Sequence, residues 1–190
     1  MKIWLASASP RRRELLERLG MEVLVRPADL EEAPIPGEAP AAFVRRIALD
    51  KLAAAPAPPA GIPAVAADTI VVVDGDILGK PVDETQAAEM LGRIQGRWHT
   101  VFSGLAVALD GRVCSGVESS RVKIAPMNEG LIRWYIATGE PMDKAGAYAL
   151  QGIGGLFVER VEGSCSNVVG LPLPLLRAFF TELGIFLPPC

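Results

Sequence analysis

Residues 64–73 read Ala-Val-Ala-Ala-Asp-Thr-Ile-Val-Val-Val, a run of small and β-branched side chains. Apolar and polar residues do not alternate in this run, which predicts a strand buried on both faces. Strands of that kind belong to sheets covered by helices on both sides. Asp68 and Thr69 are the only polar residues of the run.

On both sides of this strand, strands and helices are expected to alternate. Further strands are expected at Ile3–Ala6, Glu22–Arg26, Trp98–Leu109, Arg112–Ile124 and Phe157–Val161. Helices are expected from Pro10 to a stop at Gly20, over Pro40–Ala54, from a cap at Asp83 to about Gln95, over Asn128–Thr138 and over Pro172–Leu183. Asp110-Gly111 joins two of the strands and is a strong hairpin signal. The pattern predicts an α/β fold with a mixed sheet.

Local signals also predict the ends and the buried faces of the first two helices. Ser9 is a good N-cap, and Pro10 suits the first helical position. The faces expected to be buried are Leu15, Leu16 and Leu19 in the first helix and Phe43, Val44, Ile47 and Leu52 in the second.

Composition indicates an ordinary globular chain and narrows the range of partners. The chain has 190 residues, of which 50% are apolar and 22% charged, and a net charge of −3. We expect one domain spanning residues 1–190. The negative charge argues against a protein whose main task is to coat nucleic acid or an anionic membrane. We therefore expect neither as a partner, whereas a local basic cluster could still bind a small anionic substrate.

The cysteines and the amino terminus predict a cytoplasmic protein. Cys114, Cys165 and Cys190 are widely separated, and the only histidine is His99. This is too little for a zinc site, so we expect free thiols in a reducing compartment and a structural His99. The apolar run 3–8 ends before three arginines, at residues 11–13, and is too short for a signal peptide or a membrane span.

The first candidate site is the segment Ser7-Ala8-Ser9-Pro10-Arg11-Arg12. Small residues allow close backbone approach, and a helix N-terminus presents free N–H groups to an anion. Two arginines in the first turn oppose the helix dipole, at about 0.3–1 kcal/mol each at most, which suggests an anionic ligand. The alternative is a solvated basic turn.

The second candidate is Asp68, because an isolated carboxylate in a buried strand costs several kcal/mol unless it is paired or bound to a cation. We expect it near the end of its strand, held rigidly enough for catalysis. The alternative is an aspartate that caps a turn.

Weaker signals complete the candidate set. Gly79-Lys80-Pro81 resembles a P-loop only superficially, since its spacing is one residue short and Pro81 replaces the metal-binding hydroxyl. Segment 143–152 contains the donors Lys144 and Gln151 and is either a ligand loop or a plain turn. Glu31-Glu32 is either a metal-binding pair or an acidic surface loop. Basic groups and carboxylates without a Ser/His/Asp arrangement suit phosphate chemistry assisted by Mg²⁺ or Mn²⁺.

Five segments, in this order, resemble the Maf family of nucleoside triphosphate pyrophosphatases. They are Leu5–Arg12, Ala67–Val71, Gly79–Pro81, Asp143–Gly152 and Val169–Pro172. The resemblance implies an elongated, twisted mixed sheet of the Maf and inosine triphosphatase type, with two lobes and a central cleft. It also implies hydrolysis between the α and β phosphates, a divalent metal cation, and a possible homodimer.

The resemblance also implies roles for individual residues. Asp68 corresponds to the proton acceptor, and Glu32 and Asp68 to possible metal ligands; Asp68 either binds the metal or acts only as the base. The polar positions expected to line the cleft are Ser7, Arg12, Glu32, Lys51 and Lys80. The positions expected to select the substrate are Arg11, Thr69 and Gln151.

The Arg, Thr and Gln at these three selecting positions resemble the branch that acts on dTTP and UTP, which implies removal of unwanted or modified nucleotides. A sister branch acts on 7-methyl-GTP and typically has Trp at the first position. Leu52 and Cys165 depart from the Ala and Tyr expected there, which bears on fine specificity. The alternative function is a nucleotide-binding regulator of septum formation without essential catalysis.

Overall fold

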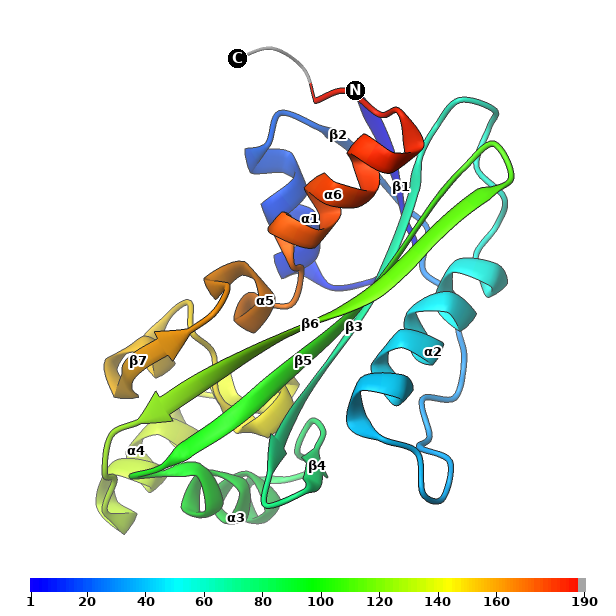
Figure 1. Cartoon of the computed structure of the whole chain (residues 1–190). Helices are drawn as coiled ribbons and strands as arrows, with labels where there is room; N and C mark the ends of the chain where they lie inside the picture. Colours follow the sequence, from blue (N-terminus) through cyan, green and yellow to red (C-terminus); the bar gives the residue numbers. More distant parts are fainter. Residues whose placement is uncertain (188–190) are drawn as a thin grey trace. The chain divides into compact units, whose positions relative to one another are not determined.

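The structure is a computed structural model that describes residues 1–187 (Figure 1). Its strands are β1 (Lys2–Leu5), β2 (Glu22–Val25), β3 (Ala64–Val73), β4 (Asp76–Leu78), β5 (Trp98–Leu109), β6 (Arg112–Ile124) and β7 (Val158–Glu162). Its helices are α1 (Pro10–Arg18), α2 (Pro40–Ala54), α3 (Glu84–Ile94), α4 (Glu129–Ala137), α5 (Cys165–Val169) and α6 (Leu173–Leu183). Three short 3₁₀ turns, η1 (Glu140–Asp143), η2 (Ala145–Ala147) and η3 (Ile153–Phe157), follow α4.

The strands form one mixed sheet in the order β2-β1-β3-β5-β6-β7, with β4 paired to β3. β1 pairs in parallel with β2 and with β3, whereas β4 and β7 pair antiparallel with β3 and β6. β5 and β6 are joined at Asp110-Gly111, where both residues have positive φ, as a two-residue hairpin turn requires. The predicted mixed α/β sheet is confirmed (Figure 1).

The chain divides into two compact units, which are described separately. Unit 1 comprises residues 1–68, 103–118 and 170–190, and unit 2 comprises residues 69–102 and 119–169. Each unit has its own apolar core, built around Ile3, Leu105 and Phe180 in unit 1 and around Leu91, Val122 and Tyr135 in unit 2. The central cleft and the single domain over residues 1–190 stay predictions.

Several local expectations were wrong. β3 runs without interruption, so Asp68 lies in the middle of the strand and not near its end. Ser9 stands at the N-cap of α1, but its side chain forms no capping hydrogen bond. Leu19 is exposed because α1 ends at Arg18, one residue before it. Leu52 is only partly buried, because Lys51 lies on the buried face of α2 instead. β4 and α5 were not predicted.

The described residues bear on the expected lack of a membrane span and on the expected free thiols. Within residues 1–187, no helix is both long enough and apolar enough to cross a membrane. In the same range, Cys114 is buried, Cys165 is exposed, and neither forms a disulfide. Cys190 lies outside the described residues.

Candidate active site

The centre of the candidate site is an ion-paired group in unit 1. Lys51 Nζ donates to Asp68 Oδ1 at 2.8 Å and lies 2.8 Å from Glu32 Oε1. Asp68 and Lys51 are 5% and 8% exposed, whereas Glu32 is exposed. The ammonium group thus offsets the cost of burying the Asp68 carboxylate, which β3 holds among apolar neighbours.

α2 delivers Lys51 because its buried face continues in helical register. Phe43, Val44, Ile47, Ala48 and Lys51 form that face, each three or four residues from another member. α2 lies directly against β5, since a Cβ at Gly104 would come within 2.0 Å of the Val44 carbonyl oxygen. The Lys51 stem is therefore buried, and its ammonium group reaches Asp68.

Arg12 forms a second buried group in unit 1. Its Nε donates to the Gly170 carbonyl at 2.8 Å, and its Nη1 donates to Ser7 Oγ at 2.9 Å. Burial lowers the pKa of Arg12, and the negative charges of Asp68 and Glu32 oppose that shift. A guanidinium stays protonated under all physiological conditions. The alternative of a solvated basic turn is therefore wrong for Arg12.

The neighbouring arginines of α1 behave differently. Arg11 is half-buried, and Arg13 is exposed and pairs with Glu17 at 2.7 Å, one turn along the helix. Such exposed i,i+4 pairs contribute only about 0.3–0.5 kcal/mol. Burial therefore separates Arg12, a candidate ligand for phosphate, from Arg13, an ordinary surface residue.

The acidic loop that carries Glu32 is tied to α2 by an ion pair that the sequence analysis missed. Arg46 donates to both carboxylate oxygens of Glu38, at 2.8 and 2.7 Å, and to the Ala33 carbonyl at 3.1 Å. The bonds from Arg46 hold the pKa of Glu38 below its ordinary value. No sequence motif marks this pair, because Glu38 lies in the loop before α2 and so outside the helical period that places Arg46. The pair holds the loop close to the turn of α2 that precedes Lys51.

The other predicted site residues lie in unit 2. Thr69 is half-buried in β3, Lys80 is exposed after β4, and Gln151 is half-buried before η3. The Gly146 N–H donates to the Gly79 carbonyl at 3.0 Å and so joins the segments of Lys80 and Gln151. Lys144 is engaged within its own segment by Asp143 and by the Glu140 carbonyl, so it is a weaker candidate donor than the sequence suggested.

His99 is buried in unit 2, in keeping with the structural role expected for it. Its Nε2 lies 2.8 Å from the Tyr148 hydroxyl, and the two rings meet edge to face. Burial lowers the pKa of His99 to about 4. The ring is therefore neutral at physiological pH and unsuited to bind phosphate by charge.

The chain is similar to a known protein family and to named proteins of several bacteria. The family model described as Maf-like protein matches residues 2–183. A dTTP/UTP pyrophosphatase of Anaeromyxobacter dehalogenans (strain 2CP-C) is 47% identical, with 98% of this chain and 96% of that protein covered. Another of Geobacter sulfurreducens is 52% identical, with 90% and 91% covered. One of Neisseria meningitidis serogroup B is 41% identical, with 96% and 94% covered.

A solved structure shares the fold. The Staphylococcus aureus Ham1 protein matches with a TM-score of 0.55 and 16% identity, covering 96% of this chain and 100% of that one. At this identity the likeness concerns the fold alone.

Proposed function

Because the chain belongs to the Maf family, we propose that it is a nucleoside triphosphate pyrophosphatase that hydrolyses dTTP and UTP to the monophosphate and pyrophosphate. The observation that carries this proposal is the name dTTP/UTP pyrophosphatase, shared by relatives that are 41–52% identical over at least 90% of this chain. The same relatives give no support to a binding-only regulator of septum formation.

Asp68 is proposed as the base that accepts a proton from the attacking water. It is fixed in the middle of β3 and paired with Lys51, so its carboxylate has little freedom to move. General base catalysis of this kind is typically worth ~10²–10⁴ in rate. Lys51 forms ion pairs with both Asp68 and Glu32 and so keeps the two carboxylates near one another.

Arg12 and Lys80 are proposed to hold the triphosphate. The Ser7 hydroxyl and the Gly170 carbonyl fix the Arg12 guanidinium, whose planar donors suit phosphate oxygens. Lys80 is exposed and can approach the substrate as a mobile point charge. Positioning and charge neutralisation supply most of the catalysis in phosphoryl transfer.

Glu32 and Asp68 also fit the divalent cation that the resemblance implies. No group of three or more His, Cys, Asp or Glu residues suited to a metal occurs within residues 1–187. Mg²⁺, however, is usually bound by one or two carboxylates together with substrate phosphates and water. Glu32 and Asp68, each 2.8 Å from Lys51 Nζ, lie near enough to one another to supply two such carboxylates. When bound, Mg²⁺ or Mn²⁺ would supply positive charge to the phosphate oxygens.

Incubation of the protein with dTTP or UTP and Mg²⁺ or Mn²⁺ tests the proposal. We expect pyrophosphate and the nucleoside monophosphate in equal amounts and no nucleoside diphosphate. Reaction in ¹⁸O-labelled water should place the label in one product only, which identifies the phosphorus that is attacked. Formation of the nucleoside diphosphate and inorganic phosphate would contradict cleavage between the α and β phosphates. Loss of activity with a chelator, restored by added metal, tests the cation separately.

Cellular setting and assembly stay predictions. A cytoplasmic protein is inferred from Cys114 and Cys165, which form no disulfide within the described residues. A homodimer follows from the family resemblance alone.

A further inference from the structure

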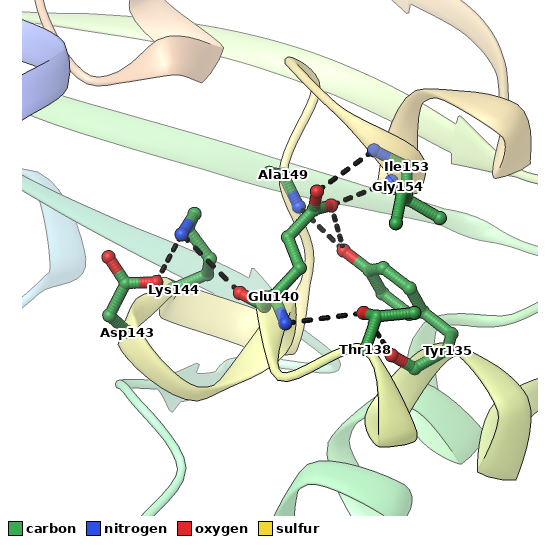
Figure 2. Close-up of polar contacts among 8 residues, drawn as sticks. All are labelled: Tyr135, Thr138, Glu140, Asp143, Lys144, Ala149, Ile153 and Gly154. Atoms are coloured by element: carbon green, nitrogen blue, oxygen red, sulfur yellow. Dashed lines mark hydrogen bonds and ion pairs between the residues drawn. The ribbon is translucent and has the colours of Figure 1, made fainter.

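Glu140, the first residue of η1, binds the backbone of a distant turn in unit 2. Its Oε2 accepts a hydrogen bond from the Ile153 N–H at 2.9 Å, and its Oε1 accepts one from the Gly154 N–H at 2.8 Å. Oε1 also accepts a bond from the Tyr135 hydroxyl at 2.8 Å. Figure 2 shows the carboxylate pointing at these three donors. Charge-assisted bonds of this kind are stronger than neutral ones.

Tyr135 extends the same contact to the other side of the turn. Its hydroxyl oxygen accepts a bond from the Ala149 N–H at 3.2 Å while the hydroxyl donates to Glu140 (Figure 2). Residues 149, 153 and 154 are thus all tied to one carboxylate and one hydroxyl. The intervening residues, 150–152, are held at both ends.

The turn is shaped to fit over the carboxylate. Gly152 has φ +93°, and a Cβ at this position would lie 2.3 Å from Glu140 Oε2. Any larger residue would displace either the turn or the carboxylate. The close fit therefore depends on Glu140 and Gly152 together.

Glu140 is itself held on its backbone. Its N–H donates to Thr138 Oγ1 at 3.2 Å, and its carbonyl accepts a bond from Lys144 Nζ at 3.3 Å. Burial disfavours the charge of Glu140, but the bonds from Gly154, Ile153 and Tyr135 outweigh burial and keep its pKa below the ordinary value of 4.5. Both carboxylate oxygens are occupied by these donors, so Glu140 is suited to hold structure and not to contact substrate.

The residue held in the middle of the turn is Gln151. Its side chain is half-buried, and its amide forms no hydrogen bond within residues 1–187. An amide carries donors and an acceptor, and the direction in which it presents them depends on the backbone below it.

We propose that Glu140, assisted by Tyr135, is a positioning residue that orients Gln151 for selection of the nucleotide base. This inference rests on the proposed function and on the substrate-selecting role that the family resemblance implies for Gln151. Discrimination by hydrogen bonds requires groups held in place, because a displaced amide recognises the right and the wrong base alike.

The test is Glu140→Gln, which keeps the side-chain shape but turns an N–H donor against the backbone N–H groups. The ratio of kcat/KM for dTTP to that for ATP should fall about tenfold, the usual worth of one well-placed hydrogen bond. The kcat for dTTP should change less than about threefold, because the groups proposed for chemistry are untouched. Hydrogen exchange of the amides in residues 149–155 should become faster. Tyr135→Phe should act in the same direction, more weakly, and serves if Glu140→Gln does not fold.

Two comparisons separate positioning from a merely structural role. Gln151→Ala should lower the dTTP/ATP ratio as much as Glu140→Gln does, and the double variant should lower it no further. Glu129→Gln, an exposed residue in α4, is the matched control and should change nothing. The positioning role would be overturned if the losses in the dTTP/ATP ratio were additive in the double variant. It would also be overturned if Glu140→Gln made amide hydrogen exchange faster but left the dTTP/ATP ratio unchanged. If the wild type releases no pyrophosphate from dTTP or UTP, the proposed function fails, and the selection role of Glu140 fails with it.

Discussion

Unit 1 buries charge, whereas unit 2 buries neutral polar groups. Among the described residues, the buried charged side chains are Arg12, Lys51 and Asp68, all of which belong to unit 1. The buried polar residues of unit 2 are His99, Ser120 and Asn167. The half-buried Glu140 of unit 2 accepts hydrogen bonds from two backbone amides and a tyrosine, and its carboxylate forms no salt bridge within residues 1–187.

This difference indicates that the two kinds of buried group suit different parts of a nucleotide. Buried charges cost several kcal/mol to desolvate and persist where their partners or a ligand offset that cost. They suit the triphosphate, the part that all nucleotide substrates share. Neutral groups with fixed direction suit the base, because a mismatched base leaves them unpaired at about 1–3 kcal/mol each. Variants of the two kinds should therefore differ in whether they change all substrates equally or change their ranking.

The largest effect is expected from Asp68→Asn. Asparagine keeps the shape of the side chain but cannot accept the proton of water, so turnover should fall at least ~10²-fold on dTTP and UTP alike. Circular dichroism should show an intact fold. Asp50→Asn, an exposed aspartate next to Lys51 in sequence, is the control and should retain activity. Near-normal turnover of Asp68→Asn would remove Asp68 from the mechanism.

A loss of stability is expected from Lys51→Met. This variant leaves the buried Asp68 carboxylate without its ammonium partner, which typically costs about 3–5 kcal/mol in the free energy of unfolding. Adding Asp68→Asn should restore most of the stability and none of the activity. Lys2→Met breaks an exposed pair with Glu22 in the same unit and should cost under about 1 kcal/mol. Urea unfolding of the four proteins measures these differences. A double variant as unstable as Lys51→Met would contradict the pairing.

The pH dependence of stability should reveal the neutral character of unit 2. The pKa of His99 is about 4 in the folded protein and 6.5 ordinarily. Between these values the unfolded chain binds a proton that the folded chain does not, so stability falls as pH falls from 6.5 to 4. The full loss is about 3 kcal/mol. His99→Gln should lack this component, since glutamine stays neutral. The difference between the two proteins should be constant above pH 6.5; parallel curves throughout would contradict the assignment.

Local signals predicted most of the fold. The bounds of α2, β3, β5 and β6 were predicted to the residue, because run length, turn residues and periodicity mark them along the chain itself. β4 was missed because three residues form a strand only through pairing with β3. α5 is one short turn that no period can reveal.

The sequence predicts a set of candidate site residues but not the contacts among them. Charged residues are mostly exposed, so nothing in the sequence marked Arg12 and Lys51 as buried. Leu52 was expected on the face that Lys51 occupies, because leucine is buried far more often than lysine. Glu140 was missed because its backbone partners, Ile153 and Gly154, lie 13 and 14 residues further along the chain. Segment 143–152 was predicted as a candidate ligand loop, but the carboxylate that holds its turn was not predicted.

The smallest effect concerns Arg11, and it compares neighbouring arginines. Arg12 is buried and tied to Ser7 and Gly170, so we expect its charge to serve every substrate. Arg11 is half-buried and is expected to meet the base, where its donors suit the carbonyl edge of thymine or uracil. The ring of 7-methylguanine carries a positive charge, which Arg11 should repel and which the face of a Trp should attract.

With a panel of nucleotides at equal concentration, we therefore expect the wild type to hydrolyse dTTP and UTP well ahead of 7-methyl-GTP and ATP. Arg11→Trp should lower the ratio of the hydrolysis rate of dTTP to that of 7-methyl-GTP about fivefold. This is the size expected of a cation–π interaction of about 1 kcal/mol. The ratio of the hydrolysis rate of dTTP to that of ATP should fall less, because adenine carries no ring charge. Arg13→Trp, on an exposed position of the same helix, is the control and should leave the ranking unchanged. A wild-type preference for 7-methyl-GTP would overturn the assignment to dTTP and UTP, yet it would leave pyrophosphate release intact. An equal loss on all nucleotides in Arg11→Trp would instead place Arg11 with Arg12, at the phosphates.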